Sequence, residues 1–169
     1  MTNFLDEIEA CIPALRRYAR ALTSSLERAD DLVQDTLERA IRKQRLFSPK
    51  GSLRTWLFTI LTNIFRNDLR AAKRRPHLTP IDELAEEPQS APEQHGRLAL
   101  SETALAIECL PDEQRQVLLL VALEGFAYKE AAAILDIPQG TLMSRLGRAR
   151  ANLRKLTDEG GKSHLRSVK

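Results

Sequence analysis

A stretch rich in proline and acidic residues, from Pro76 to about Gly96, most constrains what this chain can fold into. A proline lacks the amide donor of a helix, and its ring clashes with the preceding turn, so no long helix can cross this stretch. Its prolines are Pro76, Pro80, Pro88 and Pro92. Because apolar residues recur at helical spacing on both sides, the 169 residues are predicted to form two small domains joined by a linker.

The N-terminal half predicts three helices. Pro13 suits the first turn of a helix that follows a short amphipathic lead. Thr23-Ser24-Ser25 is expected to end this helix and can cap the next one. A second helix is expected from Leu26 to Lys43, and a third from about Leu53 to Arg74. The segment Gln44 to Ser52 is predicted to be a loop, since its Ser-Pro-Lys-Gly run turns the chain.

The C-terminal half predicts four helices, which are Leu98 to Leu110, Pro111 to Leu123, Lys129 to Leu135 and Thr141 to Leu156. The expected fold is therefore all-α, with a flexible linker between two helical domains. The predicted boundaries are 1–75 for the first domain, 76–97 for the linker, 98–157 for the second domain and 158–169 for a disordered tail.

Composition argues against several classes of protein. Cys11 and Cys109 are far apart and form no Cys/His cluster, so both are predicted to be buried apolar residues rather than zinc ligands. The histidines are scattered at His77, His95 and His164, and no catalytic motif accompanies them; no enzyme, metal or cofactor is expected. The acidic N-terminus and the lack of a long apolar run predict a cytoplasmic protein without membrane insertion.

The most specific pattern surrounds the turn Asp136 to Gly140. A compact helix with the small residues Ala131 and Ala132 comes before it, and a longer helix follows, which is the layout of a helix-turn-helix. The second helix is predicted to present polar and basic side chains to a DNA major groove, namely Thr141, Ser144, Arg145 and Arg148. A helical hairpin with a merely solvated basic face is the alternative.

Several segments resemble a known family. Leu110 to Arg115, Gly125 to Ala132 and Gly140 to Arg150 resemble region 4 of extracytoplasmic-function (ECF, group IV) sigma factors of the sigma-70 family. Asp30 to Leu37 resembles sigma region 2.2, and Thr55 to Asn63 resembles the promoter-reading helix that follows it. The sequence around Glu124 and Met143 also resembles that of the general-stress sigma factors of alphaproteobacteria.

The resemblance implies a protein that binds core RNA polymerase and directs promoter-specific initiation, usually under the control of an anti-sigma factor. The residues implied in polymerase docking are Asp30, Asp31, Gln34, Asp35 and Glu38. Those implied at the −10 promoter element are Asn63, Arg66, Asn67, Arg70, Lys73 and Arg74. Thr141, Ser144, Arg145 and Arg148 are implied at the −35 element, and the loop Phe47 to Ser52 occupies the place of the segment that captures a flipped base.

Two other functions fit parts of this pattern. A helix-turn-helix regulator that binds duplex DNA without polymerase explains the C-terminal half, but it leaves the acidic second helix and the Asn-bearing third helix unexplained. A helical adaptor that binds only proteins would use the amphipathic faces without reading DNA. Because of its intramolecular linker, the free chain is also expected to pack its domains together and to bind promoter duplex poorly.

Overall fold

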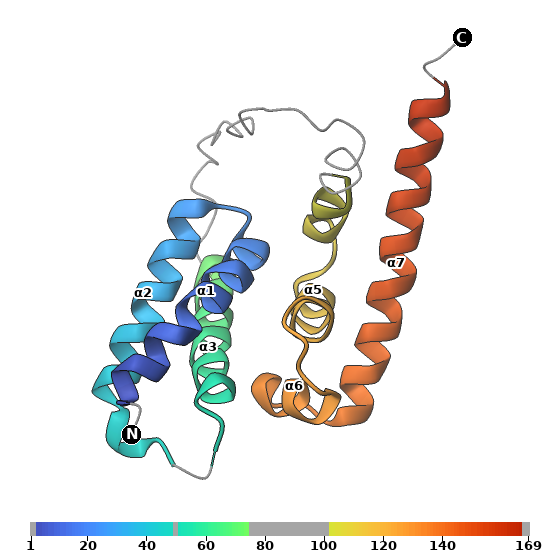
Figure 1. Cartoon of the computed structure of the whole chain (residues 1–169). Coiled ribbons are helices and arrows are strands. Elements are labelled where there is room, and N and C mark those ends of the chain that lie inside the picture. The colour runs from blue at the N-terminus through green and yellow to red at the C-terminus, as the bar shows by residue number, and fades with distance from the viewer. Residues whose placement is uncertain (1–2, 49–50, 75–101, 167–169) are drawn as a thin grey trace.

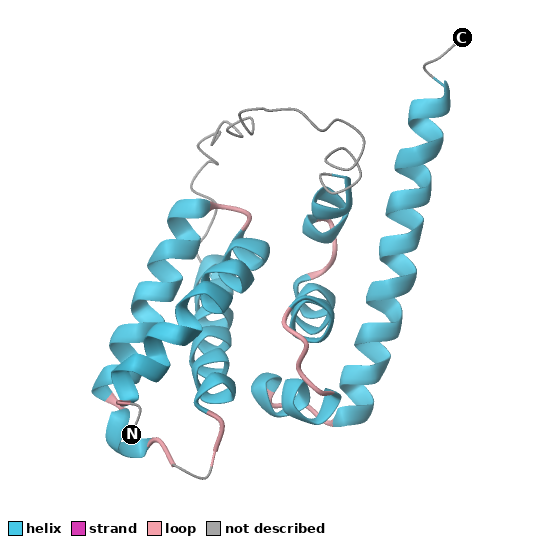
Figure 2. Ribbon diagram, viewed as in Figure 1, coloured by secondary structure: helices cyan, strands magenta, loops and turns pink. Residues whose placement is uncertain are grey.

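Every element of the computed structural model is helical within the residues it describes, which are 3–48, 51–74 and 102–166, with side chains described up to residue 158 (Figure 2). The N-terminal half contains α1 (Phe4–Thr23), α2 (Leu26–Arg42), a 3₁₀ turn η1 (Gln44–Leu46) and α3 (Leu53–Arg74). The C-terminal half contains a helix at residues 102–108, then α5 (Asp112–Leu118), a π-helical segment η2 (Leu119–Leu123), α6 (Tyr128–Leu135) and α7 (Gln139–Arg166). The linker predicted at 76–97 lies outside the described residues.

The first three helices form a bundle because each carries one apolar stripe. Their largest fully buried side chains include Leu15, Tyr18 and Leu22 of α1, and Leu57, Phe58 and Leu61 of α3. The α1–α2 corner is sharp: Ser24 adopts a left-handed φ of 55°, and the Ser25 hydroxyl accepts a hydrogen bond of 3.3 Å from the Arg28 amide. The predicted end of the first helix at Thr23 to Ser25 and the predicted capping of the second helix there are confirmed.

The prediction that a helix starts near Pro13 is wrong. One continuous α1 includes Pro13 in its interior, where the ring removes one backbone hydrogen bond. Ile8, Leu15 and Leu22 lie seven residues apart and are all buried, so a single apolar stripe runs through both parts of the helix. Burial of both ends of this stripe keeps the helix continuous despite the proline.

The helix-turn-helix is built by α6 and α7. Asp136, at a left-handed φ of 51°, ends α6, and the Ile137 amide donates to the Ala132 carbonyl over 3.0 Å. Ala131, Ala132 and Leu135 are buried, as are Leu142, Leu146 and Ala149 on the facing side of α7. The helix-turn-helix predicted from the sequence is therefore present, with small residues where its two helices meet.

Two further sequence predictions need correction. The last helix was expected to end at Leu156 with a disordered tail after it, but α7 continues to Arg166. Gly160 and Gly161 each lower helix propensity by about 1 kcal/mol relative to alanine, yet without a proline nothing forces the helix to stop. Cys109 is exposed rather than buried, since it lies in the turn after the helix at 102–108, while Cys11 is half-buried.

The two halves pack against each other. α3 lies against α6, and α1 contacts η2 and α5. The buried apolar residues of both halves form one connected cluster. Figure 1 shows α1–α3 on one side and α5–α7 on the other, with α7 along the outer edge.

Candidate nucleic-acid and partner interfaces

The outer face of α2 carries the acidic residues that the sequence assigns to polymerase docking. Asp30, Asp31, Gln34, Asp35 and Glu38 are all exposed. The opposite face holds Leu32, Val33 and Thr36 in the core, and the Thr36 hydroxyl donates to the Leu32 carbonyl over 2.7 Å. The helix therefore fixes the carboxylates by burying its other side, and they face solvent, where Glu38 also pairs with Arg42 over 3.5 Å. Exposed carboxylates of this kind can meet a basic surface.

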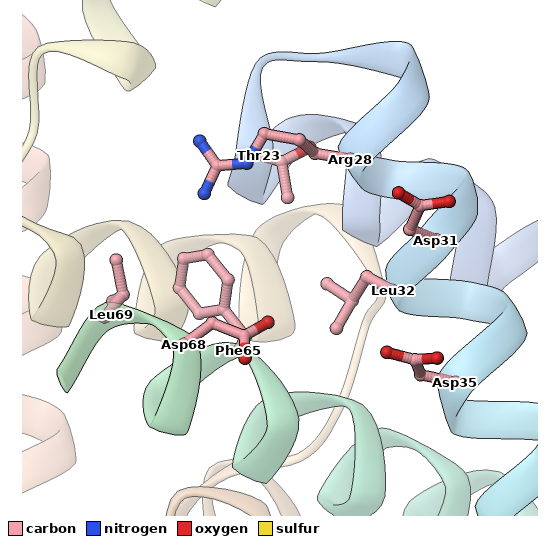
Figure 3. Close-up of a pocket in the computed structure, with 8 residues that line it drawn as sticks. All are labelled: Thr23, Arg28, Asp31, Leu32, Asp35, Phe65, Asp68 and Leu69. Atoms are coloured by element: carbon pink, nitrogen blue, oxygen red, sulfur yellow. The ribbon is translucent and has the colours of Figure 1, made fainter. Parts of the chain in front are cut away.

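Part of this acidic face borders a hollow of about 280 Å³ between α2 and α3. Figure 3 shows Asp31 and Asp35 on the α2 side and Asp68 on the α3 side, around apolar side chains that include Leu32 and Phe65. The three carboxylates outnumber the one cation of the lining, Arg28, and the apolar floor suits the long stem of an arginine or lysine whose cationic head meets the carboxylates. Sequence reasoning missed Asp68, which is surrounded by basic residues in the sequence and joins the acidic face only through helix packing.

The outer face of α3 carries the amides and cations that the sequence assigns to the −10 element. Asn63, Asn67, Arg70, Lys73 and Arg74 are exposed. Arg66 differs because its guanidinium crosses to the C-terminal half, where it donates to the Leu135 carbonyl over 2.6 Å and to Gln116 Oε1 over 3.2 Å. Burial, with the nearby charge of Arg145 as a second cause, lowers the pKa of Arg66 below its ordinary value.

The outer face of α7 is only partly free. Ser144 and Arg148 are exposed, and the Arg148 guanidinium donates to the Ser144 hydroxyl over 2.7 Å. Thr141 is half-buried, and Arg145 forms an ion pair of 3.2 Å with Glu113 of α5. The side chain of Arg145 is 19% exposed, so of the two arginines predicted to face the major groove only Arg148 is exposed.

The predicted loop before α3 is partly ordered by aromatic contacts. Phe47 lies 5.3 Å from Trp56 and 6.0 Å from Phe4, measured between ring centroids. Trp56 is half-buried in this cluster and packs against both phenylalanine rings. The Gly51 amide donates to the Ser48 carbonyl over 2.9 Å, which closes the predicted turn.

A network centred on Glu124 joins the two halves. The side chain of Glu124 has no exposed surface, and Arg17 of α1 donates to both of its carboxylate oxygens at 2.8 Å. Arg54 of α3 donates to the Glu124 carboxylate at 3.0 Å and to its backbone carbonyl at 2.8 Å. The hydrogen bond to Glu124 raises the pKa of Arg17.

Aromatic rings line the same contact. Phe126 meets Phe58 edge to face at 4.9 Å, and the Arg54 guanidinium lies 4.1 Å from the centre of the Phe126 ring. The π-helical turn places these residues: the Glu124 amide bonds to the Leu119 carbonyl, and Gly125 has a φ of +70°. Two ion pairs to Glu124 and one aromatic pair thus join the halves at this contact.

Comparison with known proteins identifies the family. Residues 8–62 match the Sigma2 domain of PhyR, and residues 100–153 match Sigma-70, region 4. The ECF RNA polymerase sigma factor EcfG of Rhodopseudomonas palustris is 44% identical over 152 residues, which cover 89% of this chain and 83% of that protein. This chain belongs to the ECF sigma factors.

Other relatives agree with this assignment. ECF RNA polymerase sigma factor SigC of Mycobacterium tuberculosis is 37% identical over 133 residues, which cover 77% of this chain and 70% of SigC. The sigma factor RpoE of Bartonella quintana, solved with the anti-sigma factor NepR, superposes with a TM-score of 0.76 at 36% identity, covering 92% of this chain and 96% of that one. CnrH, solved with the cytosolic domain of CnrY, superposes with a TM-score of 0.67 at 30% identity, covering 90% and 85%.

Family membership states the function in general terms. Sigma factors bind core RNA polymerase and direct it to promoters, so this chain acts in promoter-specific transcription initiation. Among the described residues, no helix has both the length and the apolar character needed to cross a bilayer. The same residues contain no group of three or more His, Cys, Asp and Glu side chains suited to a metal ion.

Sequence reasoning missed the residues that join the two halves. Arg17 and Arg54 look like ordinary exposed cations of amphipathic helices, and Glu124 looks like a polar helix end. The one available signal was a carboxylate placed directly between the apolar run before it and Phe126. Such a carboxylate requires cationic partners if it is buried, but the sequence does not say which ones.

Proposed function

We propose that this sigma factor uses three separate surfaces in initiation. The acidic face of α2 docks on core RNA polymerase, α3 reads the −10 element and α7 reads the −35 element. The observation that supports this most strongly is the split of basic and amide side chains between two helices in different domains, with the carboxylates gathered on a third helix. A DNA-binding protein without a polymerase partner has no use for the third surface.

The chemistry of each surface suits its partner. Exposed carboxylates favour a basic protein surface and repel DNA phosphates, so α2 serves a protein partner. The amides of Asn63 and Asn67 can read base edges, while Arg70, Lys73 and Arg74 hold phosphates. On α7, Ser144, Arg145 and Arg148 face the same side and suit a major groove.

An anti-sigma factor is proposed to control this protein. The relative RpoE was solved with the anti-sigma factor NepR, and CnrH was solved with the cytosolic domain of CnrY. The match to the Sigma2 domain of PhyR and the similarity to EcfG support placement in the general-stress group. The protein is proposed to work in the cytoplasm, where polymerase acts, and to leave all chemistry to the polymerase.

Run-off transcription with purified core polymerase tests the proposed function. The full chain is expected to yield transcripts only from templates that carry both promoter elements, and addition of a cognate anti-sigma factor should abolish them. Binding to promoter duplex without any transcript would replace this proposal with a helix-turn-helix regulator that does not recruit polymerase. Binding to core polymerase without DNA selectivity would favour a protein adaptor.

A further inference from the structure

The packed arrangement of the two domains does not fit simultaneous reading of both promoter elements. Arg66, assigned to the −10 surface, bonds to Leu135, and Leu135 is four residues before Gln139, where α7 starts. Those four residues span at most about 15 Å. Arg145 follows six residues into α7, which adds about 9 Å. The two reading surfaces therefore lie within about 25 Å of each other.

Promoter DNA places the two elements much farther apart. By their names, the −35 and −10 elements are about 25 base pairs apart, and at 3.4 Å per pair this is about 85 Å along the duplex. The packed form also uses Arg66 in a bond to the protein itself. The domains must separate before one molecule reads both elements.

We propose that Arg17, Arg54 and Glu124 form a clasp, the Glu124 clasp, that holds the sigma factor in a closed, promoter-incompetent form. This regulatory role rests on the proposed assignment of α3 and α7 to the two elements. Among the described residues, every hydrogen bond and ion pair of the Glu124 side chain is with the N-terminal domain, so its charge serves docking rather than the fold of its own domain.

The clasp is suited to reversible opening. A buried carboxylate is stable only with its cationic partners, and here both partners are arginines from the other domain. When the domains separate, water can hydrate all three charged groups, while the Phe58–Phe126 pair and the bond from Arg66 to Leu135 are also lost. Polymerase or DNA that binds the separated domains therefore has to outweigh the clasp together with the packing of α3 on α6 and of α1 on η2.

Distance measurements between two spin labels on the full chain test the clasp. Cys11→Ala and Cys109→Ser remove the native thiols, and Arg39→Cys on α2 with Ala151→Cys on α7 provides exposed label sites. Double electron–electron resonance should show a single short distance for the free protein. A complex with core polymerase and promoter should show a longer one.

Two variants weaken the clasp without touching either reading surface. Glu124→Gln keeps the shape and removes the charge, while Arg17→Gln removes a guanidinium whose hydrogen bonds and ion pair, among the described residues, are with Glu124 alone. Each should lower the ratio of closed to open molecules by at least about tenfold, the effect of losing one charge-assisted hydrogen bond. Glu108→Gln removes an exposed carboxylate from the same domain and is expected to leave the distance unchanged.

The outcomes separate the clasp from the proposed function. Opening by Glu124→Gln and by Arg17→Gln, but not by Glu108→Gln, supports the clasp. A free wild-type protein that is already open, or variants that match it, overturns the clasp even if run-off transcription succeeds. Opening without transcripts from any two-element template leaves the clasp in place and overturns the proposed function.

Discussion

At the scale of single residues, the two arginines of the recognition helix differ in what they already contact. Arg148 is exposed and bonded to Ser144, whereas Arg145 is mostly covered and paired with Glu113. Because Glu113 is itself 67% exposed, their ion pair adds little to stability. Both arginines can therefore turn to DNA without unfolding the domain.

Replacement of either arginine by alanine should spare folding and impair −35 reading. Loss of an arginine that reads a base edge should cost about 1–3 kcal/mol of binding free energy and relax selectivity at one −35 position. Loss of an arginine that holds a phosphate should instead weaken transcription from all promoters almost equally. Run-off from a −35 library with Arg145→Ala and Arg148→Ala distinguishes the two roles, and wild-type selectivity in both variants would place the reading face elsewhere.

At the scale of elements, α2 presents its carboxylates to solvent while the core holds its other face. We expect the double variant Asp31→Asn, Asp35→Asn to lose affinity for core polymerase by about tenfold or more, because two attractive charges are removed from one contact surface. Circular dichroism should show an unchanged fold. The control pair Glu9→Gln, Glu108→Gln neutralises two exposed carboxylates elsewhere on the protein. An equal loss of polymerase affinity in this control would mean that overall charge, and not the face of α2, causes the effect.

Helix α1 tolerates an internal proline at a measurable cost. Pro13 is exposed, so Pro13→Ala restores a backbone hydrogen bond and creates no cavity. The substitution should raise the free energy of unfolding by about 1–3 kcal/mol, reduced somewhat by the greater freedom of the unfolded chain. Urea denaturation measures the change, and a lower stability would mean that the proline relieves strain in α1.

At the scale of the whole molecule, sequence alone predicted the two domains better than their packing. Periodicity placed α2, α3 and α6 closely, because each buries a stripe within its own domain. The acidic face of α2 followed from the same periodicity. The docking of the two domains through Glu124 was not predictable, since Arg17 and Glu124 are far apart in the sequence and charge alone links them. The sequence likewise assigned Arg66 to DNA and gave no sign of its bond to Leu135.

The assignment of two promoter elements to two helices is tested most directly by one library experiment. Core polymerase transcribes templates randomised at both elements, with wild-type sigma factor, Asn67→Ala of α3 or Arg148→Ala of α7. Asn67→Ala should change base preference only at −10 positions, and Arg148→Ala should weaken transcription or change preference only through the −35 element. The assignment would be contradicted if each variant changed the base preference at both elements, or if neither variant changed it at either element.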